Sequence, residues 1–182
     1  MSEEMIIRHC APTLASMKTG SMFSCAYETP DEVFRSIRDL NRRLRKKGLR
    51  VLPLRWHRGR CLVYVYRPDK LHQDLQDGRV CRILRACGYT CEKPEHCLGR
   101  LMKRLMESEE FPHEIGLFLG YPPEDVEGFM HRKGEAKCTG YWKVYGDVEA
   151  AQKIFARYQK CTDVYLKQHA MGRDIERLTV AA

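Results

Sequence analysis

Hydrophobic and polar residues follow helical or strand periods along most of this chain. The clearest helix covers residues 30–48, where apolar side chains recur on one face at spacings of three and four. Thr29 and Glu32 have capping-box spacing, Pro30 occupies the first helical position and Gly48 closes the last turn. The apolar face of this helix is formed by Val33, Phe34, Ile37, Leu40 and Leu44.

Period-two patterns predict four strands. Residues 21–27 form the first, and a hairpin joins residues 49–56 to residues 60–67 across a short turn that contains Gly59. Proline removes a backbone donor, so Pro53 predicts either an edge position or a bulge. Residues 140–145 form the fourth strand.

Helical patterns fill most of the second half. They run from Pro68 to Glu107 with breaks at glycine and proline, and they resume in a long final helix between Asp147 and Gly172. The chain therefore predicts an α+β fold in a single domain over residues 1–182. Its antiparallel sheet would have about four strands in ferredoxin-like order, with residues 68–134 as a helical insertion.

The most apolar stretch is residues 111–125, which also carries several helix breakers. Gly120 suits a left-handed helix end, and Pro122 prevents the helix from continuing. Gly116 lies four positions before Gly120, on the same side of a helix, where a ligand or a backbone can approach closely. Pro123 then begins a new helix. We expect a buried helix–corner–helix with Tyr121 at the bend.

Composition restricts the class of protein without selecting a function. The chain has a net charge of +8, from 32 lysines and arginines against 24 acidic residues, which permits nucleic acid or other anionic partners. No apolar run approaches eighteen residues, so we expect no membrane span. The nine cysteines lack the regular spacing of a disulfide framework, which favours a reducing, cytoplasmic location. The oligomeric state is not indicated.

A cysteine-rich segment offers one alternative function. Four thiols close together can hold zinc or an iron–sulfur cluster, although their spacing lacks the two-residue gap of metal knuckles. Cysteines on the apolar face of a helix also act as small hydrophobic residues. The segment contains Cys81, Cys87, Cys91 and Cys97.

Nucleic-acid binding is a second alternative, through the basic helix 30–48 and the hairpin 50–67. The strand Arg60 to Tyr66 is similar to the signature strand of RNA-recognition motifs. However, Arg60, Leu62 and Val65 occupy positions where that motif has stacking aromatic residues. The basic helix could equally be a solvated surface.

The catalytic motifs that we considered are absent or incomplete. His113 and Glu114 begin a zinc-protease pattern, but Leu117 stands where the second histidine is required. Glu114 can act as a buried acid or base, or it can cap a helix or pair with an arginine. His9 and Cys10 are adjacent, but neighbouring helical residues point about 100° apart. No particular reaction is indicated.

Three motifs resemble one known family. They are His9 to Ala15 with Lys18, then Pro112 to Pro122 with Asp125, Val126, Gly128 and Phe129, and finally Gly140 to Tyr145. Together they resemble an uncharacterised domain-of-unknown-function family of anaerobic Gram-positive bacteria, except that Ser16-Met17 replaces an expected Gly-Ile. The resemblance implies a cytoplasmic bacterial protein. Because relatives are encoded near flavodoxin-like or iron-uptake genes, it also implies a redox or iron-linked accessory role with a redox partner protein, and it supplies no catalytic residues.

The leading hypothesis is a small-ligand pocket around residues 111–125. Glycines would admit the ligand, aromatic rings would stack on it, and ionisable groups would fix its charge or transfer protons. The proposed ligand-binding residues are His9, Cys10, Lys18, Glu114, Gly116, Gly120, Tyr121 and Trp142.

Overall fold

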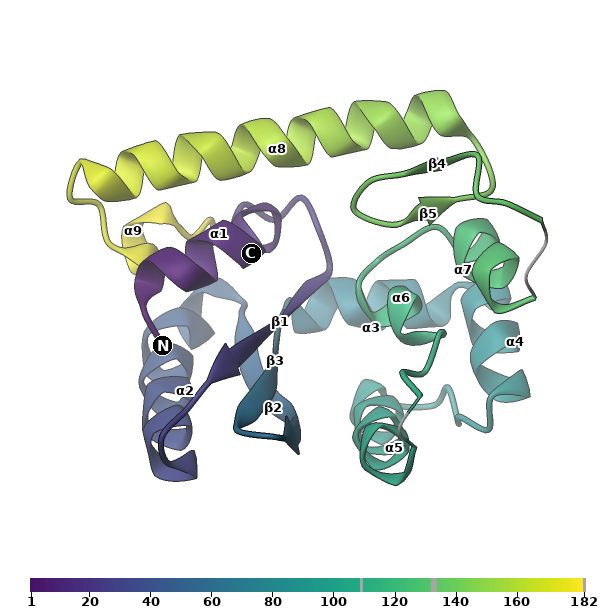
Figure 1. Cartoon of the computed structure of the whole chain (residues 1–182), viewed down its shortest axis with the longest axis horizontal. Helices are drawn as coiled ribbons and strands as arrows, with labels where there is room; N and C mark the ends of the chain where they lie inside the picture. Colours follow the sequence, from purple (N-terminus) through teal and green to yellow (C-terminus); the bar gives the residue numbers. More distant parts are fainter. Residues whose placement is uncertain (109, 132–133, 182) are drawn as a thin grey trace. The chain divides into compact units, whose positions relative to one another are not determined.

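The protein has an α+β fold that divides into two compact units. The computed structural model describes residues 1–108, 110–131 and 134–181. Unit 1 comprises Met1–Asp69 and Lys160–Ala182, and unit 2 comprises Lys70–Gln159. In Figure 1, unit 1 takes the purple-to-blue start of the chain and its yellow end, and unit 2 takes the teal and green part.

Unit 1 contains a three-stranded antiparallel sheet. Its strands are β1 (Gly20–Ala26), β2 (Arg50–His57) and β3 (Arg60–Tyr66), with β3 in the centre. Pro53 lies on the edge strand β2, and the register shifts between Pro53 and Arg55. Both predicted alternatives, an edge position and a bulge, therefore apply to this proline. Arg58 and Gly59 both adopt positive φ values, 46° and 70°, which match a tight hairpin turn.

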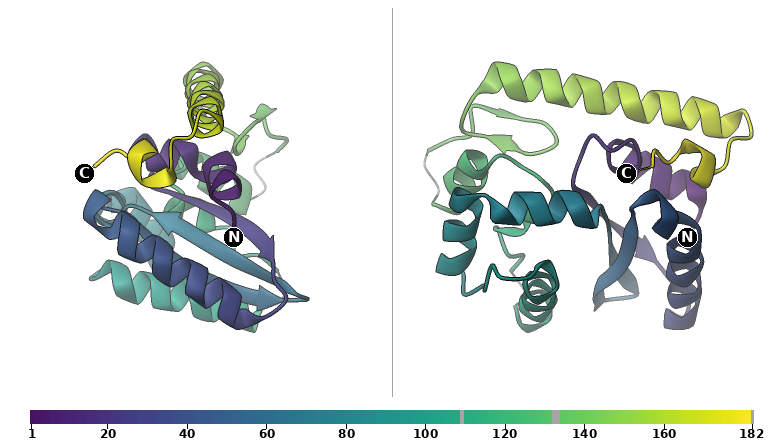
Figure 2. Two further views of the ribbon diagram at one scale, coloured as in Figure 1. Left: turned by 90° about the vertical axis from the view of Figure 1, so that its left-hand side faces the viewer. Right: turned by 180° about the vertical axis from the view of Figure 1, so that it is seen from behind.

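Helices pack on one face of this sheet to form the core of unit 1 (Figure 2). They are α1 (Glu3–Leu14), α2 (Pro30–Leu44) and α9 (Ile175–Leu178), with the short 3₁₀ helix η1 (Arg45–Lys47) after α2. Gly48 has the predicted left-handed conformation (φ 74°). Thr29 makes no side-chain cap, so the predicted capping box does not form, and Pro30 at the first turn sets the start of α2. The core includes Ile7, Leu14, Phe23, Ile37, Val63 and Val65.

A buried arginine connects four segments of unit 1. Arg67 is 2% exposed and donates from Nε to the carbonyl of Thr13 (2.8 Å) and from Nη2 to the carbonyls of Leu14 and Val180 (2.8 Å each). Its Nη1 donates to the carbonyl of Lys47 (3.2 Å). Burial lowers the pKa of this guanidinium, but arginine stays protonated. Arg67 thus satisfies carbonyls at the end of α1 and secures the C-terminal segment.

Unit 2 is mostly helical. Its elements are α3 (Pro68–Gln76), which begins two residues before the unit boundary, α4 (Gly78–Ala86), α5 (Pro94–Glu107), α6 (Ile115–Phe118), α7 (Pro123–Met130), and the strands β4 (Cys138–Thr139) and β5 (Lys143–Val144). The long helix α8 (Val148–Ala170) follows, as predicted, and the boundary between the units falls within it.

The predicted four-stranded ferredoxin-like sheet is wrong. The first three strands pair as β1-β3-β2, whereas residues 138–144 form a separate two-stranded sheet in unit 2. Only Lys143 and Val144 of the predicted fourth strand are extended and paired. The next two backbone N–H groups, of Tyr145 and Gly146, donate to the Asp125 carboxylate, so they do not extend a strand ladder.

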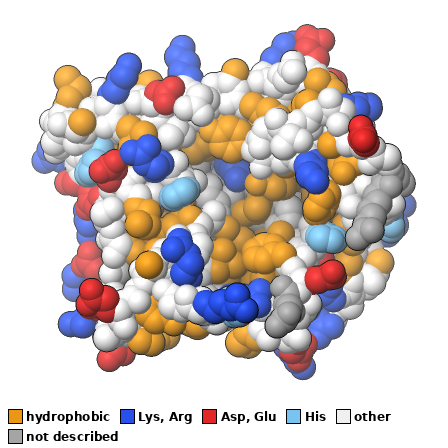
Figure 3. Space-filling model, in the orientation of Figure 1, with side chains coloured by type: hydrophobic (Ala, Val, Ile, Leu, Met, Phe, Trp, Pro, Cys, Tyr) orange, Lys and Arg blue, Asp and Glu red, His pale blue; other side chains and the backbone are white. Residues whose placement is uncertain are grey.

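Charged side chains of both signs are interspersed over the face shown in Figure 3. Within the described ranges, no helix combines the length and apolar composition needed to cross a membrane.

Candidate functional site

An apolar cavity of about 340 Å³ lies in unit 2 beside the predicted bend. Its walls come from the segment before α6, from α6 and α7, and from the turn before β5. It is lined by Phe111, Pro112, His113, Ile115, Gly116, Tyr121, Asp125, Val126, Phe129, Trp142 and Lys143.

The bend forms as its glycines and prolines predict. Helix α6 ends at Phe118, Gly120 takes a left-handed conformation (φ 72°), and the N–H of Tyr121 donates to the carbonyl of Gly116 (3.0 Å). A Cβ atom on Gly116 would lie 2.9 Å from Val126 Cγ2 and 3.0 Å from Tyr121 Cδ2. Glycine at this position therefore lets α6 pack closely against α7 and Tyr121.

Aromatic rings make up much of the cavity wall. The rings of Tyr121 and Trp142 lie 5.0 Å apart between centroids, and Phe155 meets Trp142 edge-on at 4.5 Å. Beside them, His113 packs edge-on against Phe129 at 4.7 Å. Such rings offer both faces and edges to a flat ligand.

Asp125 holds the two sides of the cavity together. It is 4% exposed, and its Oδ2 accepts a hydrogen bond from Trp142 Nε1 (2.7 Å). Its Oδ1 accepts from the backbone N–H groups of Tyr145 (2.7 Å) and Gly146 (2.8 Å). The carboxylate is thus used within the protein and connects α7 to the segment around β5. The sequence analysis names Asp125 only as part of a family motif, and no local signal indicates a partner seventeen residues away.

Lys143 supplies the positive charge at the apolar cavity. Its Nζ lies 5.1 Å from the centroid of the Phe129 ring, a cation–π distance. The Asp125 carboxylate already accepts three hydrogen bonds. A ligand in the cavity therefore meets apolar surface with one cation at its edge.

A second, polar cavity of about 360 Å³ also has Phe111, Pro112 and His113 in its lining. The predicted ligand-binding residue Glu114 lines this polar cavity and not the apolar one. Glu114 is 2% exposed, accepts from the Tyr89 hydroxyl at 2.8 Å, and its Oε1 lies 2.7 Å from Arg104 Nε. The pKa of Tyr89 is raised, chiefly by burial and then by Glu114. Glu114 therefore pairs with an arginine, the structural alternative stated above.

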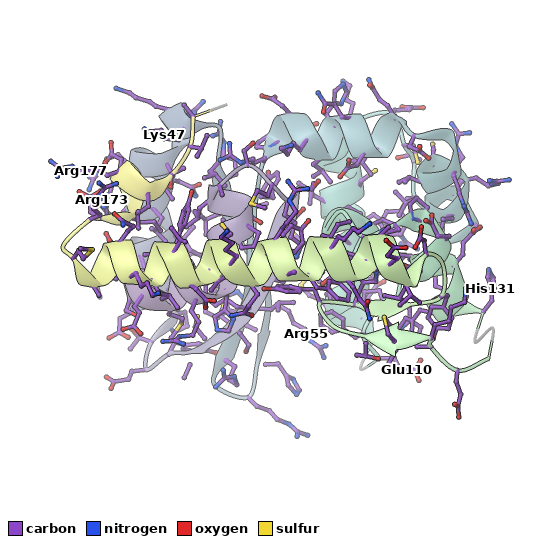
Figure 4. The ribbon with its side chains drawn as sticks, turned by 90° about the horizontal axis from the view of Figure 1, so that it is seen from above. Lys47, Arg55, Glu110, His131, Arg173 and Arg177 are labelled. Atoms are coloured by element: carbon purple, nitrogen blue, oxygen red, sulfur yellow. The ribbon has the colours of Figure 1, made fainter. Side chains whose placement is uncertain are left out.

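The remaining lining residues of the polar cavity are mostly polar or charged. They are Cys87, Arg100, Arg104, Glu107, Ser108, Glu110 and Met130. Figure 4 labels Glu110 and also His131 in this unit.

The other predicted ligand-binding residues fall in two groups. Gly116, Tyr121 and Trp142 come together on the apolar cavity, whereas Gly120 shapes the bend without lining it. His9, Cys10 and Lys18 lie in unit 1. His9 stacks on Phe23 at 5.4 Å, and Cys10 is fully buried. Their part in a common pocket stays a prediction.

Lys18 and Cys10 are both buried in unit 1. Burial raises the pKa of the Cys10 thiol to about 12, and the charge of Lys18 opposes this shift. Burial likewise lowers the pKa of Lys18 from 10.5 to about 8. The environment thus disfavours the charged form of each group, so Cys10 lacks the lowered pKa of reactive cysteines.

The buried Lys18 predicts a pH dependence of stability. Between pH 8 and 10.5 the unfolded chain binds a proton at Lys18 that the folded chain does not, so stability falls as the pH is lowered through this window. Relative to Lys18→Met, wild-type protein should gain about 2 to 3 kcal/mol between pH 7 and pH 10. Urea denaturation at each pH measures this, with the exposed Lys46→Met as control. A constant difference between the Lys18 variant and wild type would contradict it.

The thiol segment forms a small cluster. The Cys91 thiol donates to the carbonyl of Cys81 (3.5 Å), and the Cys97 thiol donates to the carbonyl of Thr90 (3.1 Å). Burial raises the pKa of Cys91 to about 12. Cys87 lies apart, on the polar cavity. In the parts of the chain that the structure describes, no group of three or more His, Cys, Asp or Glu residues is placed to hold a metal. The geometry therefore gives the metal alternative no support.

The basic helix α2 is partly neutralised. Arg42 pairs with Asp39, and Arg43 pairs with Glu3 at 2.7 Å. On β3, Tyr64 and Tyr66 are buried and offer no exposed ring for base stacking. Basic side chains do extend outward near α9, where Figure 4 labels Lys47, Arg173 and Arg177. These features give no specific support to nucleic-acid binding.

Comparison with known proteins identifies one relationship. A family model described as a protein of unknown function (DUF3793) matches residues 6–179. No curated protein and no solved structure matches the chain. The match confirms the resemblance to a domain-of-unknown-function family that the motifs indicate.

Proposed function

Because the chain belongs to DUF3793, a family of unknown function, we propose a function from its own geometry: unit 2 binds a small, largely apolar molecule with a flat ring in the apolar cavity. The observation that carries this proposal is a cavity of about 340 Å³ walled by aromatic rings. This volume lies within the range of small-molecule sites, which are mostly apolar with a few placed polar groups.

The wall chemistry supports the ligand class. Tyr121 and Trp142 present ring surface, and burying a flat apolar molecule against them removes apolar area from water. Lys143 at the edge adds a preference for a ring that bears electron-rich or negative substituents.

The cavity supports binding more than catalysis. Its described lining contains no serine, threonine or cysteine, and its buried carboxylate is held by three hydrogen bonds. A nucleophile paired with a base would be needed for covalent catalysis. A ligand-binding accessory role, including a redox or iron-linked one, is compatible with this lining.

The test is to fill the cavity. Ile115→Phe adds a ring at a residue that lines the cavity and is 8% exposed. Indole is the probe, and saturation-transfer NMR measures its binding. We expect wild-type protein to bind indole and Ile115→Phe to bind it at least about tenfold more weakly, because the space is occupied.

A matched control adds the same ring elsewhere. Val164→Phe places phenylalanine on an exposed part of α8, where 46% of the residue is accessible, and should leave indole binding unchanged. His113→Trp fills the cavity from an exposed lining residue and serves if Ile115→Phe does not fold. Wild-type protein that does not bind indole, or cavity-filled variants that bind it normally, would show that the proposal is wrong.

A further inference from the structure

The polar cavity is lined by an arginine whose Nε atom has no acceptor in the described part of the chain. The Nε atom of Arg100 is buried and has no hydrogen-bond partner among the described residues. Buried donors in native proteins are nearly always satisfied, so such an atom requires an explanation. A bound acceptor is one explanation, because Arg100 lines a polar cavity. Since Nε itself is buried, the guanidinium must turn toward the cavity for Nε to meet such a group.

The other charged groups that the structure describes in this cavity have partners or face water. Arg104 Nε is also buried without a well-aligned hydrogen bond, but it forms an ion pair with Glu114 at 2.7 Å, and Nη1 donates to the carbonyl of Cys87 (3.1 Å). Glu107 pairs with Lys103 at 3.6 Å. Glu110 is exposed, so water hydrates its carboxylate.

The Cys87 thiol does not oppose the binding of an anion in this cavity. Burial raises the pKa of the Cys87 thiol, and the Glu114 carboxylate raises it further, so this thiol adds no negative charge at neutral pH. Arg104 is held in place by two partners, which gives the cavity a fixed wall. Among the described residues that line this cavity, Arg100 is therefore the arginine without a carboxylate partner.

We propose that the polar cavity binds an oxyanion, the carboxylate or phosphate of a small molecule, through the guanidinium of Arg100. The planar guanidinium presents parallel N–H donors that match two oxygens of either group. The cavity volume of about 360 Å³ accommodates the oxyanion together with part of the molecule that carries it. This site is separate from the apolar cavity of the proposed function, although the two share three lining residues.

Titration with inorganic phosphate and, separately, with acetate tests the proposal. Both are followed by NMR chemical shifts against sodium chloride at equal ionic strength. We expect saturable shifts with at least one of the two anions, and the anion that saturates identifies phosphate or carboxylate as the preferred group. Arg100→Met should weaken that binding at least tenfold. Arg82→Met makes the same change at an exposed position on α4 and should not weaken it.

A stability measurement provides a second, independent readout. Methionine keeps the apolar stem of Arg100, and the guanidinium that it removes has an unsatisfied Nε. Without added oxyanion, Arg100→Met should therefore melt no lower than Arg82→Met. Arg100→Lys, which keeps the charge but not the planar fork, should bind the anion more weakly than wild type.

Three results would overturn the proposal. One is the absence of saturable shifts with either anion. Another is equal binding by wild type and Arg100→Met. The third is a melting temperature of Arg100→Met well below that of Arg82→Met, since this would show that the arginine already has a partner in the free protein. Indole binding should be unaffected by Arg100→Met, so the two cavities are tested separately.

Discussion

The Arg67→Met variant is expected to lose about 4 kcal/mol of unfolding free energy in unit 1. Arg67 is buried and donates four hydrogen bonds to backbone carbonyls. Methionine fills similar space but removes all four hydrogen bonds, and each lost bond costs about 1 kcal/mol. The carbonyls of Thr13 and Leu14 keep bonds from the N–H groups of Ser16 and Val180. Urea denaturation followed by circular dichroism measures the loss.

The hairpin provides a matched control for Arg67. Arg60 is exposed and donates to the hydroxyl and carbonyl of Ser24 on β1. Because water replaces these bonds, Arg60→Met should cost no more than about 1 kcal/mol. Amide exchange should also show that the segment around Val180 opens in Arg67→Met and not in Arg60→Met. Equal losses in the two variants would mean that the buried carbonyls find other donors.

The Asp125→Ala variant should destabilise unit 2 by about 3 kcal/mol and release Trp142. Two backbone N–H groups and the Trp142 indole lose their acceptor at once, and all three donate to a buried carboxylate. The fluorescence of Trp142 should shift to the red as its ring, now 8% exposed, meets water. Carrying Trp56→Phe in all the proteins compared makes Trp142 the reporter.

An exposed aspartate shows how much of this effect is particular to Asp125. Asp147 accepts one hydrogen bond, from the N–H of Ala150 (3.0 Å), at the start of α8. Asp147→Ala should therefore cost about 1 kcal/mol, the usual value of an N-cap, and leave the Trp142 emission unchanged. If Asp125→Ala keeps both its stability and its blue emission, the carboxylate does not hold the cavity walls together.

Local signals predicted many of the elements. Proline fixes φ, and glycine permits the left-handed conformation, so these residues mark the helix 30–48, the hairpin and the bend of residues 111–125. The hairpin also has period-two patterning, and Gly48 and Gly120 have the left-handed conformation expected of helix ends. These features need only neighbouring residues, so periodicity and breaker positions suffice to find them.

The candidate site was predicted in part. The density of apolar residues around Gly116 and Tyr121 indicated a buried bend, and both residues do line the apolar cavity with Trp142. Glu114 was expected to face the ligand, but its partners are Tyr89 and Arg104, 25 and 10 residues earlier. In the sequence, Glu114 stands in an apolar stretch without an obvious partner, which suggests a functional carboxylate. Hydrophobic periodicity does not reveal that Tyr89 and Arg104 contact it.

By itself, the sequence determined local features of this protein: the position of α2, α8 and the first three strands, which of their faces are apolar, and that residues 111–125 turn sharply. Backbone sterics and burial periodicity act within a few residues, so they can be read from the order of side chains. Only the tertiary structure decided that residues 138–144 pair separately from the three-stranded sheet, and that Arg67, Asp125 and Glu114 have distant partners. These contacts depend on which buried donor meets which acceptor across the fold. The partners are far apart in the chain, so the pattern of neighbouring residues does not predict the pairing.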